Sequence, residues 1–182
     1  MRRIIASTYT TIDGFIDNPH EWSLQYNDAS AQQYALDLAL GASALLLGRV
    51  TYEGMAQAWP HMGGNPYADH INTIDKYVVA SNPVDAETWS PATVVPGADL
   101  VRGVSHIKST GEGDILIWGN GQLTDALAHA GLLDEYRIWI YPVVKGDGEP
   151  LFRPESRTGL EHAGTTTFES GLVVLSYRVT TA

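Results

Sequence analysis

The chain has 182 residues, of which 44% are hydrophobic, and a formal net charge of −10. That length suits one domain over residues 1–182 with a continuous core, and the acidic charge argues against nucleic-acid partners and anionic membranes, which need basic surfaces. Cysteine is absent, which excludes disulfides, thiolate zinc sites and cysteine nucleophiles.

Three further features bear on localisation and on metal binding. The apolar run that begins the chain stops at Ser7, too early for the hydrophobic region of a signal peptide. No stretch approaches the roughly 20 apolar residues that span a bilayer. The six histidines are scattered without metal-ligand spacing. We therefore expect a cytoplasmic protein with no membrane partner and no metal site.

The first half of the chain alternates strand and helix signals. Residues 3–9 are a short β-prone run, which predicts a first strand. Ser30 to Gln33 has the spacing of a capping box, and apolar residues follow at helical period until Gly41. The wholly apolar run 44–47 predicts a strand covered on both faces. A second helix is predicted to start near Thr51.

The second half continues this alternation. Strands are predicted at 77–80, 114–118 and 136–144, with a further strand and a helix expected before residue 114. A helix at 123–130 has apolar residues at i, i+3, i+4 and i+7. The tail, 165–180, has alternating apolar residues around a glycine-containing turn, which predicts a β-hairpin.

This order of elements predicts the fold class. Alternating strands and helices favour parallel pairing with helices on both faces, and the terminal hairpin adds antiparallel strands. No linker divides the chain, and long loops are predicted at 60–72 and 145–158. The sequence thus predicts an α/β fold with a mixed, mostly parallel central sheet flanked by helices and ending in an antiparallel hairpin.

Three predicted strands end in turns rich in glycine and polar residues, where open α/β sheets collect ligands. These turns are Gly48-Arg49-Val50-Thr51, Ser81-Asn82-Pro83 and Gly119-Asn120-Gly121. Arg49 adds positive charge and Thr51 a hydroxyl at a helix start. Gly119 and Gly121 are expected to let the backbone reach a diphosphate in conformations closed to other residues, and Asn120 tolerates a left-handed conformation. Each turn is also compatible with an ordinary turn, and Arg49 with a solvated surface charge.

Three other residues are candidates for contact with a substrate. Asp13 and Asp28 offer carboxylates, and Trp22 offers a surface on which a flat ring stacks. The alternatives remain open: Asp13 as a turn residue, Asp28 as a helix cap, and Trp22 as a core residue.

Several segments carry a resemblance to a known family over nearly the whole chain. They are Ser7–Gly14, Leu46–Glu53, Lys76–Ser81, Asp114–Gly121 and Gly131–Tyr136. The chain resembles the dihydrofolate reductase-like family, and within it the riboflavin-biosynthesis reductase branch. That branch contains the C-terminal reductase domain of the bifunctional deaminase-reductase and its stand-alone bacterial relatives. The resemblance implies NADPH as the cofactor. As substrate it implies a small heterocycle such as a pterin or 5-amino-6-(5-phosphoribosylamino)uracil.

The resemblance also implies roles for residues. The segments matching Gly48–Thr51 and Gly119–Gly121 hold the cofactor diphosphate, the position matching Ser81 lies near the 2′-phosphate, and the Asp13-Gly14 loop lies over nicotinamide and substrate. The implied cofactor-binding residues are Gly48, Arg49, Thr51, Ser81, Gly119, Asn120, Gly121, Gln122 and Leu123. Trp22 and Asp28 are then the candidates for substrate binding.

The expected activity is hydride transfer by an NADPH-dependent oxidoreductase. Such an enzyme needs a proton for the substrate as well as a hydride. Asp13 is the candidate donor, if burial raises its pKa, and ordered water is the alternative. The rival functions are a non-catalytic module that holds a nucleotide, flavin or pterin, and an acidic scaffold. The aromatic run Tyr136–Tyr141 suggests a homodimer.

Overall fold

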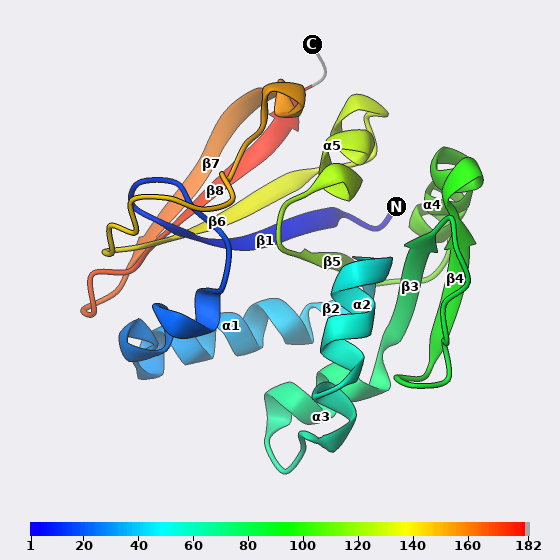
Figure 1. Cartoon of the computed structure of the whole chain (residues 1–182), viewed down its shortest axis with the longest axis horizontal. Helices are drawn as coiled ribbons and strands as arrows, with labels where there is room; N and C mark the ends of the chain where they lie inside the picture. Colours follow the sequence, from blue (N-terminus) through cyan, green and yellow to red (C-terminus); the bar gives the residue numbers. More distant parts are fainter. Residues whose placement is uncertain (181–182) are drawn as a thin grey trace. The chain divides into compact units, whose positions relative to one another are not determined.

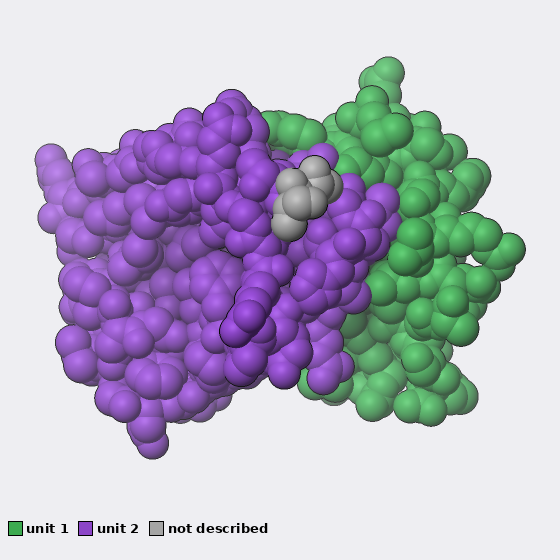
Figure 2. Space-filling view, turned by 90° about the horizontal axis from the view of Figure 1, so that it is seen from above, with its two compact units in different colours: residues 1–4, 36–117 green, residues 5–35, 118–182 purple. Residues whose placement is uncertain are grey.

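The computed structural model describes residues 1–180 and forms two compact units whose sequences interleave (Figures 1 and 2). The first unit holds residues 1–4 and 36–117, and the second holds residues 5–35 and 118–182. Three elements run from one unit into the other: strand β1 (Ile4–Thr11), helix α1 (Ala29–Leu40) and strand β5 (Asp114–Trp118). A single domain over residues 1–182 stays a prediction.

The first unit is built on parallel strands. Their order is β4 (Ala92–Pro96), β3 (Asp75–Ala80), β2 (Ala42–Gly48) and β5. Its helices are α2 (Arg49–Ala56), α3 (Pro66–Thr73) and α4 (Leu100–Ser109). The run Leu45-Leu46-Leu47 in β2 is completely buried, as expected for a parallel strand that is covered on both faces.

The second unit combines one parallel and two antiparallel pairings. Its strand order is β1, β6 (Glu135–Tyr141), β8 (Val173–Thr180) and β7 (Gly159–Thr167). β1 and β6 are parallel, whereas β8 is antiparallel to both β6 and β7. Helix α5 (Gln122–His129) follows β5. In Figure 1, β6, β8 and β7 lie side by side with the hairpin turn at one end.

Short 3₁₀ turns fill parts of the loops. They lie at Pro19–Glu21, Leu24–Tyr26, Trp59–His61, Gly97–Asp99 and Pro154–Ser156. No helix among the described residues is long and apolar enough to cross a membrane.

The predicted fold class is confirmed: the strands are mostly parallel, helices accompany them, and the chain ends in an antiparallel hairpin. The long loop predicted at 60–72 is wrong, because α3 begins there at Pro66. The start signal is in the sequence: the Asn65 side chain accepts from the Ala68 N–H (2.9 Å), and proline suits the first position of a helix. The strand predicted at 136–144 ends at Tyr141, because Pro142 has no N–H to donate.

The aromatic strand β6 faces inward. Tyr136, Trp139 and Tyr141 are at most 2% exposed. The surface patch on which we based a homodimer is therefore not formed by this strand, and the homodimer itself stays a prediction.

Lys76 on β3 is completely buried. Its ammonium donates to the carbonyl of Asn72 (2.7 Å) and lies 4.9 Å from the centre of the Trp89 ring. The Asn72 side chain accepts from the Trp89 indole N–H (2.8 Å). Burial lowers the pKa of Lys76 to about 8, and the Asp75 charge opposes this. The lysine therefore connects α3 to Trp89 while carrying a charge that is poorly solvated.

This environment predicts stability that rises at alkaline pH. Between pH 8 and the ordinary lysine pKa near 10.5, the unfolded chain binds more protons at Lys76 than the folded chain does. The contribution of Lys76 to the free energy of unfolding should therefore increase across that window, by about 3 kcal/mol at most. Urea unfolding at pH 7, 8, 9 and 10 measures the free energy of unfolding of the wild type and of Lys76→Met. The difference between the two should change with pH across this range. A difference that stays constant with pH would contradict it.

Candidate functional site

The turn after β2 places a glycine and an arginine at the start of α2. Gly48 is the N-cap residue, and a Cβ built on it would meet no atom within 4 Å. Arg49 is the first helical residue, 38% exposed, and its guanidinium pairs with Glu53 one turn later (3.0 Å). Thr51 lies within the first turn, where backbone N–H groups have no partner inside the helix. The turn thus offers N–H donors, a cation and open space together.

Ser81 lies at the same edge of the parallel sheet as this turn. β2 and β3 are neighbours, with Gly48 opposite Val79, and Ser81 directly follows β3. Its hydroxyl is so close to Gly97, after β4, that a Cβ at residue 97 would clash with it. Within the first unit, the structure therefore brings Gly48, Arg49, Thr51 and Ser81 to one edge.

The remaining predicted cofactor residues belong to the second unit and follow β5. Gly119 has φ +88°, which favours glycine, whereas Gly121 has φ −162°, an extended conformation open to any residue. The expectation of a special backbone conformation is thus confirmed at Gly119 and wrong at Gly121. A Cβ at either position would meet nothing within 4 Å. Gln122 and Leu123 are the first residues of α5, so their N–H groups point out of its N-terminus.

Asn120, between these glycines, turns its side chain inward. Its amide nitrogen donates to the carbonyl of Leu151, and its amide oxygen accepts from the hydroxyl of Thr124. The same hydroxyl accepts from the N–H of Gly121 (2.9 Å). The Asn120 side chain therefore holds the turn in place and is not directed at a ligand.

Arg153 is a residue of this region that the sequence did not identify. It binds the carboxylate of Asp125 through two nitrogens (2.7 and 3.1 Å) and reaches the carbonyl of Asn120 (3.4 Å). Nothing in the local sequence distinguishes it from an exposed loop arginine, since its partners lie 28 and 33 positions away.

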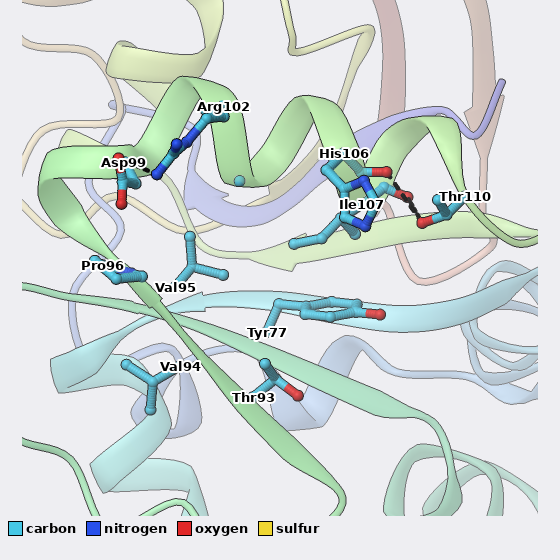
Figure 3. Close-up of a pocket in the computed structure, with 11 residues that line it drawn as sticks. Tyr77, Thr93, Val94, Val95, Pro96, Asp99, Arg102, His106, Ile107 and Thr110 are labelled. Atoms are coloured by element: carbon cyan, nitrogen blue, oxygen red, sulfur yellow. Dashed lines mark hydrogen bonds and ion pairs between the residues drawn. The ribbon is translucent and has the colours of Figure 1, made fainter.

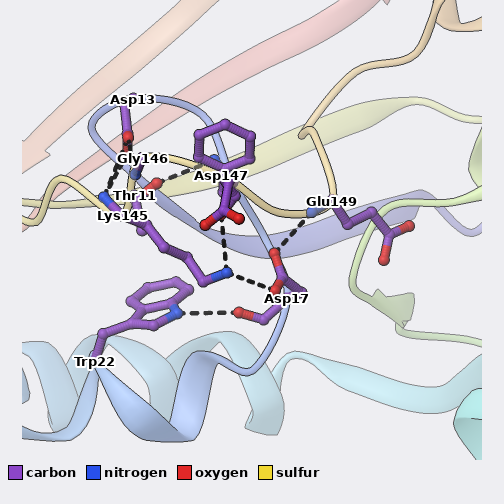
Figure 4. Close-up of polar contacts among 9 residues, drawn as sticks. Thr11, Asp13, Asp17, Trp22, Lys145, Gly146, Asp147 and Glu149 are labelled. Carbon is purple, nitrogen blue, oxygen red and sulfur yellow. Dashed lines mark hydrogen bonds and ion pairs between the residues drawn. The ribbon is translucent and has the colours of Figure 1, made fainter.

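Asp13 lies in the loop after β1 and is exposed (Figure 4). Its carboxylate is hydrogen-bonded by the Thr11 hydroxyl and accepts from the backbone N–H groups of Gly146 (2.7 Å) and Lys145 (3.1 Å). These bonds, chiefly that of Thr11, lower the pKa of Asp13 to about 2. The condition for a proton donor, burial that raises this pKa, is therefore not met, and the carboxylate is ionised at neutral pH.

Asp17 joins the same loop to the β6–β7 loop, and Trp22 contacts Asp17 within its own loop (Figure 4). The Trp22 indole N–H donates to the carbonyl of Asp17 (3.0 Å), and its ring packs edge-on against Tyr141 at 5.4 Å. The Asp17 carboxylate binds the Lys145 ammonium (2.6 Å), which lowers the pKa of Asp17 and raises that of Lys145. Trp22 is 8% exposed, so the core alternative describes its position.

Asp28 caps helix α1. One carboxylate oxygen accepts from the N–H of Ala31 (2.9 Å) and the hydroxyl of Ser30, and the other from the N–H of Ser170 in the hairpin turn (3.2 Å). The cap alternative is confirmed, and α1 begins at Ala29 instead of after the predicted capping box. The Ser30 hydroxyl and the Ala31 N–H lower the pKa of Asp28 to about 2. Both of its oxygens thus have partners within the chain.

An aromatic cluster lies between β1, β6 and α1 in the second unit. Trp139 lies 5.3 Å from Tyr9 and 5.2 Å from Tyr34, between ring centres. The hydroxyls of Tyr9 and Tyr141 are hydrogen-bonded to each other, and Tyr141 donates to the side chain of Asn27 (3.1 Å). Burial raises the pKa of both tyrosines, so they stay protonated. The alternation along β6 indicated an inward face but not which rings meet there.

The first unit also has a groove of about 380 Å³ between α4 and strands β3 and β4 (Figure 3). Val95 and Ile107 form its apolar floor, and Tyr77, Arg102 and His106 line its sides. None of the residues predicted for the site lies in it. Among the described residues, no group of three His, Asp or Glu side chains is placed to hold a metal ion.

Comparison with known proteins supplies the family. The model of the RibD C-terminal domain matches residues 2–174. The protein YyaP of Bacillus subtilis strain 168, named as uncharacterized, is 27% identical over 187 aligned residues, covering 97% of this chain and 94% of YyaP.

Two solved structures share the fold. One is a Shewanella sp. PV-4 protein assigned to riboflavin biosynthesis (TM-score 0.71, 19% identity, 98% of this chain and 99% of that one). The other is dihydrofolate reductase from Enterococcus faecalis, solved with NADP(H) (TM-score 0.65, 16% identity, 97% and 96%). At these identities the likeness establishes the fold, while the family match extends over nearly the whole sequence. The chain therefore belongs to the RibD C-terminal domain family.

Proposed function

We propose that this protein is an NADPH-dependent reductase of a small heterocycle, of the kind used in riboflavin biosynthesis or pterin metabolism. One observation carries the proposal: helix α5 begins at a glycine N-cap, Gly121, with open space where a side chain would project. Such helix N-termini bind phosphate through free N–H groups. The family and the NADP(H) complex of a protein with the same fold support the choice of cofactor.

The residues present fit such a cofactor. In the second unit, Gly119 and Gly121 leave space that any Cβ would take up. The first N–H groups of α5, at Gln122 and Leu123, would hold the diphosphate together with the turn that precedes them. Arg49 and Ser81 would bind the 2′-phosphate, for which a cation and a hydroxyl are suitable partners.

When bound, NADPH supplies the hydride. The chain must then orient the substrate, exclude water and deliver a proton. Because hydrogen bonds keep the pKa of Asp13 near 2, we assign the proton to an ordered water molecule. Asp13 instead holds the β6–β7 loop through Lys145 and Gly146.

This assignment predicts a pH profile. Asp13 should stay ionised from pH 4 upward. The kcat profiles of the wild type and of Asp13→Asn between pH 5 and 9 should therefore have the same shape. The variant should lower kcat by a factor that is constant with pH, because it loosens the loop without removing a proton donor. An acid or alkaline limb present in the wild type and lost in Asp13→Asn would return Asp13 to the role of donor.

The proposed function is tested by binding and turnover together. Titration with NADPH should give saturable binding, and NADPH oxidation should be measured across pyrimidines, pterins and quinones. Oxidation that depends on one of these substrates supports the reductase. Saturable binding without turnover on any of them would favour the non-catalytic module, and no NADPH binding would overturn the reductase.

A further inference from the structure

The loop between β6 and β7, residues 142–158, is attached to two other loops of the second unit. Two of its carbonyls accept hydrogen bonds from the loop after β1. The carbonyl of Val143 accepts from the N–H of Ile12, and that of Glu149 accepts from the N–H of Ile16 (both 2.9 Å). The N–H of Leu151 donates back to Gly14 (2.8 Å). Backbone bonds of this kind keep the segment in one register, so its next residues reach the β5–α5 turn from a defined position.

The same loop also forms hydrogen bonds with the turn Gly119–Gly121. The carbonyl of Leu151 accepts from the Asn120 side chain. Two residues later, Arg153 donates to the Asn120 carbonyl (3.4 Å) and forms a two-nitrogen contact with Asp125 on α5. Asn120 is thus held through its side-chain amide and its backbone carbonyl, and α5 through Asp125 in its first turn.

The Arg153–Asp125 pair is largely buried, so loss of the arginine would leave a buried carboxylate without its cation. The Asp125 side chain is 9% exposed and that of Arg153 is 20% exposed. Oδ2 of Asp125 receives both arginine nitrogens, whereas its Oδ1 is buried without a hydrogen-bond partner. A buried carboxylate that loses its cation must find another partner or move toward water. Asp125 lies four residues after Gly121, so such movement would displace the start of α5.

We propose that Arg153 is a positioning residue for the cofactor. By binding Asp125 and the carbonyl of Asn120, it holds the Gly119–Gly121 turn and the first N–H groups of α5 in the arrangement that receives the diphosphate. This inference rests on the proposed function, because it requires that NADPH binds at this turn. It adds a residue from a different loop, which itself does not contact the cofactor.

The test compares two ligands on the full chain. We assign the NADPH diphosphate to the β5–α5 turn, whereas adenosine 2′,5′-bisphosphate lacks the diphosphate bridge and reports binding of the 2′-phosphate. Arg153→Met should weaken NADPH binding about tenfold or more and leave the dissociation constant of the bisphosphate within twofold. Arg153→Lys, which keeps the charge but not the two-nitrogen contact, should recover part of the loss. Arg157→Met, an exposed arginine of the same loop, is the matched control and should change neither.

A second variant guards against a simple folding defect. Arg153→Met leaves a buried unpaired charge, so Arg153→Met/Asp125→Asn should regain melting temperature while its NADPH affinity stays low. Unchanged NADPH affinity in either folded variant, or an equal loss for both ligands, would overturn the positioning role. If wild type binds neither ligand, the proposed function itself fails, and that result is read before any variant is made.

Discussion

Gly121→Val should abolish NADPH binding in a protein that still folds. Gly121 has φ −162°, which valine adopts readily, and no atom lies within 4 Å of the Cβ position. The side chain would therefore fill the space we assign to the diphosphate without straining the backbone. Differential scanning fluorimetry should give a melting temperature within about 2 °C of wild type, while the stabilisation by saturating NADPH disappears. Gly121→Ala should show a smaller loss of the same kind.

Two other glycines serve as controls for this prediction. Gly119→Ala places a Cβ on a residue with φ +88°, so its melting temperature should fall whether or not NADPH binds there, by an amount equivalent to about 1 kcal/mol. Gly164→Ala, at a strand position with equally open space, should change neither quantity. If Gly121→Val melts like wild type and is stabilised by NADPH as wild type is, the diphosphate does not bind at this turn.

NADPH should bind at least tenfold more tightly than NADH. The difference comes from the 2′-phosphate, for which Arg49 and Ser81 are available at one edge of the first unit. A charge-assisted bond to phosphate contributes roughly 1.5–3 kcal/mol, which corresponds to tenfold or more in affinity. Titrations of both cofactors should be made at low and high salt, because the NADPH preference should decrease as salt screens the charge.

Arg49→Ala should remove most of that preference while leaving NADH affinity nearly unchanged. Arg49 is paired with Glu53 on the surface of α2 (3.0 Å), a contact that contributes little to stability. Arg102→Ala, another exposed arginine with a carboxylate partner one helical turn away, is the matched control and should keep the preference. Equal dissociation constants of wild type for the two cofactors would contradict the assignment of the 2′-phosphate to this edge.

Local chemistry explains which elements could be predicted. The apolar run of β2 needs cover on both faces wherever it lies, so its assignment as a buried strand did not depend on its neighbours. The positive φ at Gly119 was predictable, since a glycine directly after a strand marks a turn. The start of α3 at Asn65-Pro66 is also marked by local sequence, because asparagine is a common N-cap residue and proline suits the first helical position. The loop predicted there did not take this signal into account.

The properties that decide the chemistry depend on residues distant in sequence. The pKa of Asp13 is lowered in part by backbone N–H groups at positions 145 and 146, which no pattern around residue 13 reveals. Asn120 turns inward because the carbonyl of Leu151 and the hydroxyl of Thr124 lie there. Arg153 acquires its place only when its loop meets α5. The sequence by itself determined the strands, the fold class and the glycine turns, since these follow from local conformational preference and periodic burial. Only the tertiary structure decided which carboxylate is ionised and which arginine supports the turn, because charge and hydrogen bonding depend on partners that folding brings together.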